Sequence, residues 1–104
     1  MSSQVFLILL ALADRDLHGY AISADVADRT DGQTRLTAST LYAALKRLLA
    51  DGLIEELERP DADDPRRRYY RITRAGRAAG RAEAARLDAL AGMARAKRWL
   101  PRTR

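Results

Sequence analysis

The sequence predicts a mainly α protein of the α+β class: a winged helix-turn-helix with a two-stranded wing, followed by a long C-terminal dimerisation helix. Three segments before residue 52 show helical spacing of apolar residues, and two segments after it alternate as strands do. A turn containing Gly32 separates the second and third helices, as in helix-turn-helix units. The order helix, helix, helix, strand, strand, helix is that of a winged helix.

Length and charge divide the chain into two parts. We expect residues 1–73 to form the winged-helix domain and residues 74–104 to form the dimerisation helix and a frayed tail. The net charge of +5 suits a polyanionic partner such as nucleic acid. However, residues 1–73 hold 10 Lys and Arg against 12 Asp and Glu, and residues 74–104 hold 9 against 2. DNA contacts by the first part must therefore rest on local clusters.

The first helix begins after Ser2 or Ser3 and runs to about Ala13, through VFLILLALA. Nine apolar residues are too few to span a bilayer, which needs about 20, and no Lys or Arg precedes them as in a secretion signal. We therefore expect a cytoplasmic protein with no membrane contact. This helix is apolar nearly all round, so a second subunit is expected to cover part of it. The interface candidates here are Phe6, Leu9 and Leu10.

The second helix begins near His18 or Gly19 and ends near Arg29. The third lies between Thr37, a good N-cap, and Gly52, a good residue just beyond a C-cap. Its packing face is predicted to hold Leu41, Ala44, Leu45, Leu48 and Leu49, and its opposite face Ser39, Ala43, Lys46 and Ala50.

Residues 53–58 and 67–73 are predicted to form two strands joined by an Asp-rich turn. Tyr70 and Ile72 share one face of the second strand, and Tyr69 and Arg71 share the other. The acidic residues of the first strand are placed to pair across the sheet with the cations of the second, which are Arg68 and Arg71.

Thr73 is the expected N-cap of a last helix of about 25 residues. The helix is rich in alanine and has few large side chains, so we expect an arm that pairs with another chain. Its interface candidates are Leu87, Leu90 and Met93. Trp99 near the end is either a hydrophobic anchor or a stacking surface for a flat ligand.

The residues expected to contact DNA gather at three places. Hydroxyls at the start of the third helix can bind phosphate with help from the helix dipole, and cations behind them can reach phosphates or guanine edges. A basic cluster lies at the base of the wing, whose acidic tip we expect to stay outside the groove. The alternative without DNA contact is that Thr37 only caps the helix and that the cations of the helix and the wing are solvated surface residues. The set is Thr37, Ser39, Thr40, Tyr42, Lys46, Arg47, Arg66, Arg67 and Arg68, with Tyr20 as a phosphate contact or a core residue.

No residues suggest an enzyme, a metal site or a cofactor. The chain has no Cys, which excludes disulfides and a Cys-based zinc site. His18 is the only histidine, so a helix cap or packing explains it better than metal binding. We find no Gly-rich phosphate loop and no Ser-His-acid set.

The segments LILLALAD, HGYAI, LTASTLYAALKRLLADGLI and RRRYYRITRAGR resemble the PadR family of transcriptional regulators. The resemblance covers about residues 5–90. The chain is similar to the small subgroup of the family, whose members have a single C-terminal helix. It implies a homodimeric repressor that binds near-palindromic double-stranded DNA and is released by a small-molecule effector. It also implies DNA contacts by Ser39, Thr40, Tyr42, Lys46, Arg67 and Arg68. The alternative function is a winged-helix module that binds a protein and not DNA.

Overall fold

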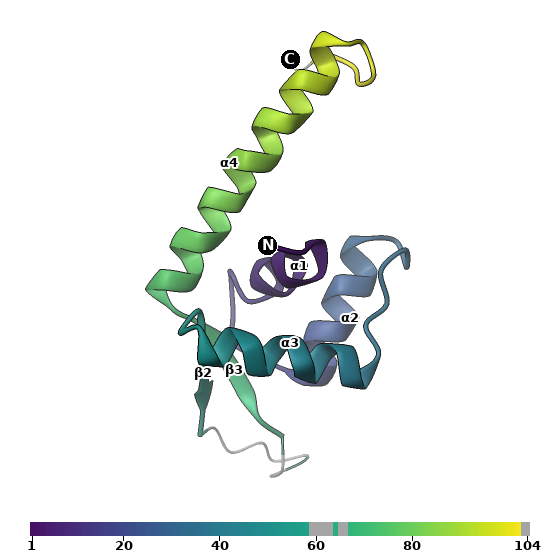
Figure 1. The fold of residues 1–104 in the computed structure, drawn as a ribbon. Helices are drawn as coiled ribbons and strands as arrows, with labels where there is room; N and C mark the ends of the chain where they lie inside the picture. The colour runs from purple at the N-terminus through teal and green to yellow at the C-terminus, as the bar shows by residue number, and fades with distance from the viewer. Residues whose placement is uncertain (59–63, 65–66, 103–104) are drawn as a thin grey trace.

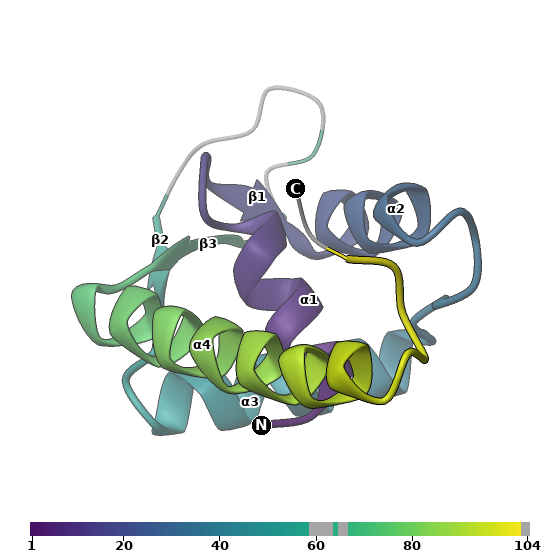
Figure 2. The same cartoon turned by 90° about the horizontal axis from the view of Figure 1, so that it is seen from above.

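The computed structural model describes residues 1–58, 64 and 67–102. The helices are α1 (Ser3–Ala11), α2 (Gly19–Arg29), α3 (Ala38–Ala50) and α4 (Arg74–Ala96), and the strands are β1 (Leu17–His18), β2 (Ile54–Leu57) and β3 (Tyr69–Ile72). Helices α1 to α3 form a compact body with the sheet at one side, and α4 leaves it as a long arm (Figure 1). Seen from above, α4 crosses over α1 (Figure 2).

Side chains cap the helices at their first turns. The backbone N–H of Val5 donates to Ser2 at 3.2 Å, and that of Gly76 donates to Thr73 at 3.0 Å. The predicted cap at Thr37 is confirmed, as is the helix end at Gly52, where φ is 72°. In that left-handed region a residue without Cβ is favoured.

The sheet differs from the expected two strands. A third strand, β1, pairs antiparallel with β3, with Leu17 opposite Tyr70 and His18 opposite Tyr69. Strand β2 pairs with the other edge of β3, with Ile54 opposite Ile72. Two residues are too few to show the alternation that marks a strand, so β1 leaves no pattern in the sequence.

The core forms where α1, α2, α3 and the sheet meet. The apolar stripe of α3 is confirmed, because Leu41, Leu45 and Leu48 are all buried. Tyr70 and Ile72 share one face of β3, as the strand alternation predicted, and the structure shows that this face is the buried one. The core also holds Ile8, Leu9, Ala11, Leu12, Leu17, Ile22, Val26 and Ile54.

Ion pairs join the strands β2 and β3 and link β3 to the loop after α1. The predicted pairs across β2 and β3 are present, with Arg68 and Glu56 2.7 Å apart and Arg71 and Glu55 3.8 Å apart. Arg71 also donates to both carboxylate oxygens of Asp16, at 3.1 and 3.4 Å, which the sequence did not suggest. This contact raises the pKa of Arg71, first by hydrogen bonding to Asp16 and then by its charge.

Candidate nucleic-acid interface

The exposed face of α3 is polar at its start and cationic further along. Thr37 connects three hydroxyls: its own donates to Thr40 at 2.9 Å and lies 3.3 Å from that of Ser39. The N–H of Thr40 donates back to Thr37 at 3.2 Å. This cap leaves Ser39 at the surface and fixes the first turn of the helix. A fixed helix N-terminus with exposed hydroxyls is suited to an anion such as phosphate.

Lys46 lies further along the same face and is exposed. Among the residues that the structure describes, no carboxylate forms an ion pair with it. Arg47 instead pairs with Asp51 at 3.3 Å, next to the end of the helix. Both of these side chains are well exposed, so the pair contributes little stability and leaves Arg47 available to a stronger anion.

A groove of about 490 Å³ opens beside this face. It collects side chains from three places in the fold: the start of α2, the exposed face of α3 and the entry to β3. The lining residues are His18, Gly19, Tyr20, Tyr42, Asp64, Arg67, Arg68 and Tyr70. Four of the residues predicted to contact DNA therefore line one concavity, although they are far apart in the sequence. They are Tyr20, Tyr42, Arg67 and Arg68.

Tyr20 is 77% exposed, so its interpretation as a core residue is wrong. The first turn of α2 points it outward, and its ring stacks at 6.4 Å on that of His18. The ring of His18 meets Tyr69 edge-on at 5.3 Å, and its Nδ1 accepts from the N–H of Ala21 at 3.2 Å. His18 is thus the helix cap that was predicted, and it also supports the aromatic wall of the groove.

Tyr42 and Gly19 form a close contact across the groove. A Cβ on Gly19 would lie 2.8 Å from the hydroxyl of Tyr42 and 3.3 Å from its Cζ. A Cβ at position 19 would therefore require the exposed ring of Tyr42 to shift. Sequence reasoning missed Gly19, because nothing in the chain indicates which residues of α3 face α2.

Two arginines at the base of the wing, Arg67 and Arg68, line the groove. Arg68 reaches back to Glu56, but both side chains are exposed, so this pair is weak. Arg67 is exposed on the wall of the groove. Arg66 and most of the acidic wing tip lie outside the described residues.

Tyr70 also lines the groove, although it is mostly buried. Burial raises the pKa of its hydroxyl, and the nearby charge of Glu56 raises this pKa further.

The residues predicted to form the dimer interface lie on α1 and α4. A cleft of about 220 Å³ between these helices is lined by Phe6, Leu9, Leu10, Ala13, Ile72, Arg77, Gly80, Arg81 and Ala84. Along α4, Leu87 is 39% exposed, Leu90 46% and Met93 65%. Leu9 differs from these residues of α4, because it is 2% exposed within the single chain.

The described part of the chain has no helix long and apolar enough to cross a membrane. It also has no group of three side chains of the types that commonly hold a metal ion.

Comparison with known proteins gives consistent results. The model of the transcriptional regulator PadR-like family matches residues 8–82. The chain is 40% identical over 72 residues to a transcriptional regulator of Mycobacterium tuberculosis, a match that covers 69% of this chain and 64% of that protein. The matches to sequence relatives span less than two thirds of each relative's length.

Solved structures have the same fold. A PadR family regulator of Clostridium difficile superposes with a TM-score of 0.78 at 24% identity, covering 90% of this chain and 96% of that one. PadR of Bacillus subtilis, solved in complex with operator DNA, gives a TM-score of 0.71 at 21% identity, covering 81% of this chain and 48% of that one.

Proposed function

Because the chain belongs to the transcriptional regulator PadR-like family, we propose that it is a sequence-specific DNA-binding regulator. In this proposal it acts in the cytoplasm as a homodimeric repressor on a near-palindromic operator. A small-molecule effector releases it from the DNA.

One observation carries the proposal: Tyr42 of α3 borders the same groove as Arg67 and Arg68 at the basic entry to β3. The opposite face of α3 is committed to the core, so the helix presents one surface only. A helix that offers short hydroxyls first and an exposed lysine further along can approach base edges in a major groove. Arg67 and Arg68 then lie beside it, in reach of the phosphate backbone.

We assign a role to each predicted contact residue, and for Arg66 the assignment rests on the sequence alone. Thr37 holds the start of α3, and Ser39 and Thr40 offer hydroxyls to a phosphate or a base edge. Tyr42 and Lys46 reach the bases, and Tyr20 contacts the backbone from α2. The phosphate contacts come from Arg47, Arg66, Arg67 and Arg68. To make them, Arg47 leaves its ion pair with Asp51 and Arg68 leaves its ion pair with Glu56.

The dimer is proposed from α1 and α4. The arm exposes Leu87, Leu90 and Met93 to solvent although they lie on a regular helix, which is the arrangement expected of a surface that another chain covers. Phe6 and Leu10 line the cleft that faces the base of the arm. A two-fold dimer would place two copies of α3 on one side, matching the two halves of a palindromic operator.

Selection of bound duplexes from a random library, followed by gel-shift titration, tests the proposal. We expect a selected duplex to bind far more tightly than a scrambled one. Lys46→Ala with Arg67→Ala should weaken binding and lower the slope of log K against log salt by about 0.9 for each phosphate interaction that the variant removes. Arg74→Ala, which removes an exposed cation outside the groove, serves as the matched control.

The alternative module that binds protein gives the opposite result. No duplex would be enriched, and the double variant would bind DNA no differently from the Arg74→Ala control. A stable protein partner that co-purifies without nucleic acid would then favour that alternative, which the net acidity of residues 1–73 supports.

A further inference from the structure

The strongest positive charge of the chain lies away from the groove. Of the residues from 74 onward, 9 are Lys or Arg and 2 are Asp or Glu. One of those two acids, Glu83, is already paired with Arg86 at 2.6 Å. The cations at the end of α4 form what we call the tail cluster, which also includes one aromatic residue: Arg95, Lys97, Arg98, Trp99 and Arg102.

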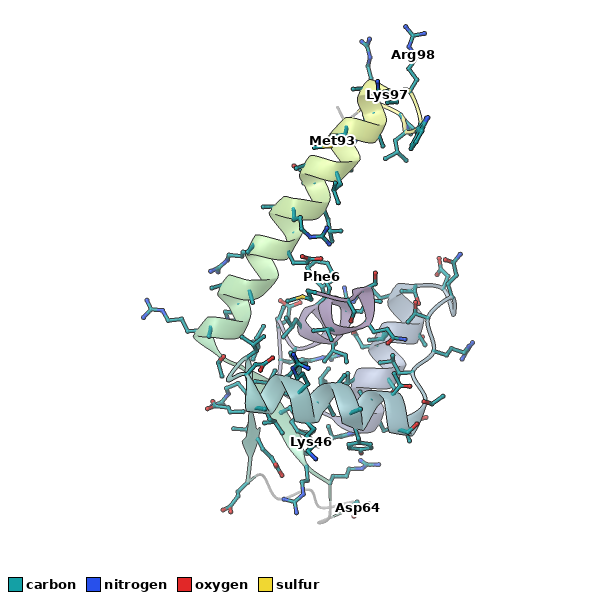
Figure 3. The ribbon with its side chains drawn as sticks, viewed as in Figure 1. Phe6, Lys46, Asp64, Met93, Lys97 and Arg98 are labelled. Carbon is teal, nitrogen blue, oxygen red and sulfur yellow. The ribbon has the colours of Figure 1, made fainter. Side chains whose placement is uncertain are left out.

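The tail cluster is remote from the groove. In Figure 3, Lys97 and Arg98 lie at the far end of α4, and Lys46 lies at the opposite end of the molecule. The long axis of the protein measures 51 Å. Contacts of α3 and the wing with DNA therefore leave the charge of the tail cluster unexplained.

The tail cluster is held in a defined shape. Helix α4 ends in two hydrogen bonds, from the N–H of Trp99 to the carbonyl of Ala94 and from the N–H of Arg98 to that of Arg95, both 2.9 Å. These are the two bonds of a Schellman cap, which turns the chain back after the helix. The turn fixes Trp99 and its neighbours relative to the helix end.

Arg98 occupies the left-handed position of this cap, with φ of 64°. Glycine is the residue that this position favours, because a Cβ there is strained. A bulky cation at a glycine position is locally unfavourable, so replacing Arg98 with glycine should relieve this strain.

The side chains of the tail cluster are available to a partner. Within the part of the chain that the structure describes, no carboxylate pairs with its cations. Trp99 is 80% exposed and Leu100 is 43% exposed. Cations gathered on one surface without carboxylate partners match the phosphate backbone of double-stranded DNA.

We propose that the tail cluster is a second contact site for double-stranded DNA, independent of base sequence and separate from the α3 groove. It binds the phosphate backbone through Arg95, Lys97, Arg98 and Arg102. A regulator bound to its operator would thereby also hold a second duplex segment.

Trp99 provides a local probe, because it is the only tryptophan in the chain. We expect its emission to change when a 30-base-pair duplex of random sequence is added to the full chain at about 50 mM salt. The change should reverse at about 0.5 M salt, since phosphate contacts release counterions. This test needs no operator, so it stands or fails apart from the proposed function.

Two variants separate the sites. Lys97→Gln with Arg98→Gly removes two charges and relieves the left-handed strain, so the fold should be as stable as before or more so. The midpoint of the Trp99 response should move to a duplex concentration roughly tenfold higher or more. Lys46→Ala with Arg67→Ala, which changes one cation of α3 and one of the groove, should leave the Trp99 response unchanged.

Four results would overturn the proposal. The first is that the emission of Trp99 fails to respond to the duplex. The second is that Lys46→Ala with Arg67→Ala abolishes the response while Lys97→Gln with Arg98→Gly keeps it. The third is that the emission changes when the protein is diluted and not when DNA is added, which would show that a second copy covers Trp99. The fourth is a response to vesicles of phosphatidylglycerol and phosphatidylcholine but not to the duplex, which would make the partner a membrane.

Discussion

The hydroxyl of Tyr42 lies over Gly19, so close that a Cβ on that residue would stand 2.8 Å from it and displace the ring. This contact sets where the first turn of α2 stands relative to the exposed face of α3. Two aromatic residues that border the groove, Tyr20 and Tyr42, therefore depend on one residue that has no side chain. The most direct test of the groove is a change at Gly19 that leaves every proposed DNA contact in the chain.

We expect Gly19→Ala to move the Tyr42 ring, because the added carbon would stand 2.8 Å from its hydroxyl. Affinity for the selected duplex should fall about three- to tenfold, or roughly 0.7–1.4 kcal/mol, with a small change in thermal stability. Gel-shift titration and thermal unfolding measure the two effects.

A double-mutant cycle with Tyr42→Phe provides the control. Removing the hydroxyl relieves the closest approach, so Gly19→Ala should cost less affinity when combined with Tyr42→Phe than in the wild type. Equal decreases in the two backgrounds would show that Gly19 acts through something other than Tyr42.

Gly76 is predicted to be essential for stability. A Cβ there would overlap the carbonyl oxygen of Leu53 and stand 2.8 Å from Cγ1 of Ile72. Because the first of these is backbone, the start of α4 must shift, and overpacking of this kind typically costs roughly 1–3 kcal/mol. Urea unfolding of Gly76→Ala should show this decrease in the free energy of unfolding.

Gly80→Ala is the matched control on the same helix, since a Cβ there meets nothing within 4 Å. Alanine is favoured over glycine inside a helix by about 0.5–1 kcal/mol, so this variant should be as stable as the wild type or slightly more stable. If both variants were destabilised equally, the contact with Leu53 would not be the cause.

The arm and the core should respond differently to the same charged substitution. Leu90 is 46% exposed and Met93 is 65% exposed, so Leu90→Asp with Met93→Asp should leave the single chain folded and weaken the proposed dimer. Sedimentation velocity should show monomers with a normal helical circular dichroism spectrum. A wild-type protein that sediments as a stable monomer would remove the dimer from the proposal.

Leu9→Asp should instead unfold the chain, because Leu9 is 2% exposed within it. An unpaired carboxylate in that position loses its hydration without gaining a partner. The substitution therefore tests the core and not the interface, although the apolar character of α1 made Leu9 a reasonable interface candidate.

Acidification should weaken an ion pair within helix α4, between Glu83 and Arg86. Glu83 is buried, and the hydrogen bonds that Arg86 donates to it, at 2.6 and 2.8 Å, hold the pKa of this carboxyl below its usual 4.5. A carboxyl whose pKa is lower in the folded state stabilises the fold above pH 4.5. That contribution disappears as the pH falls through the folded pKa.

Thermal unfolding between pH 7 and pH 3 measures this effect. The wild type should lose more stability on acidification than Glu83→Gln, because the variant has no proton to bind at this position. Parallel pH profiles for the two proteins would mean that the pair with Arg86 does not contribute.

The sequence by itself determined the four helices, two of the three strands and the packing face of the third helix. Helix and strand periodicity placed four helices and two strands within a few residues of their observed bounds, identified Leu41 and Leu45 as packing residues, and put Tyr70 and Ile72 on one face. Those features depend on neighbours within one or two turns, which a sequence displays directly. The cap residues Thr37 and Thr73 were predictable for the same reason.

Only the tertiary structure decided what lies next to what. The β1 strand exists because β3 offers it an edge, and Gly19 matters because α3 places Tyr42 over it. Arg71 finds Asp16 more than fifty residues earlier in the chain. Tyr20 and Trp99 are exposed, and Leu9 is buried, because each depends on which other elements arrive to cover it. Contacts between residues distant in the sequence are set by packing of the whole domain, and no local pattern records them.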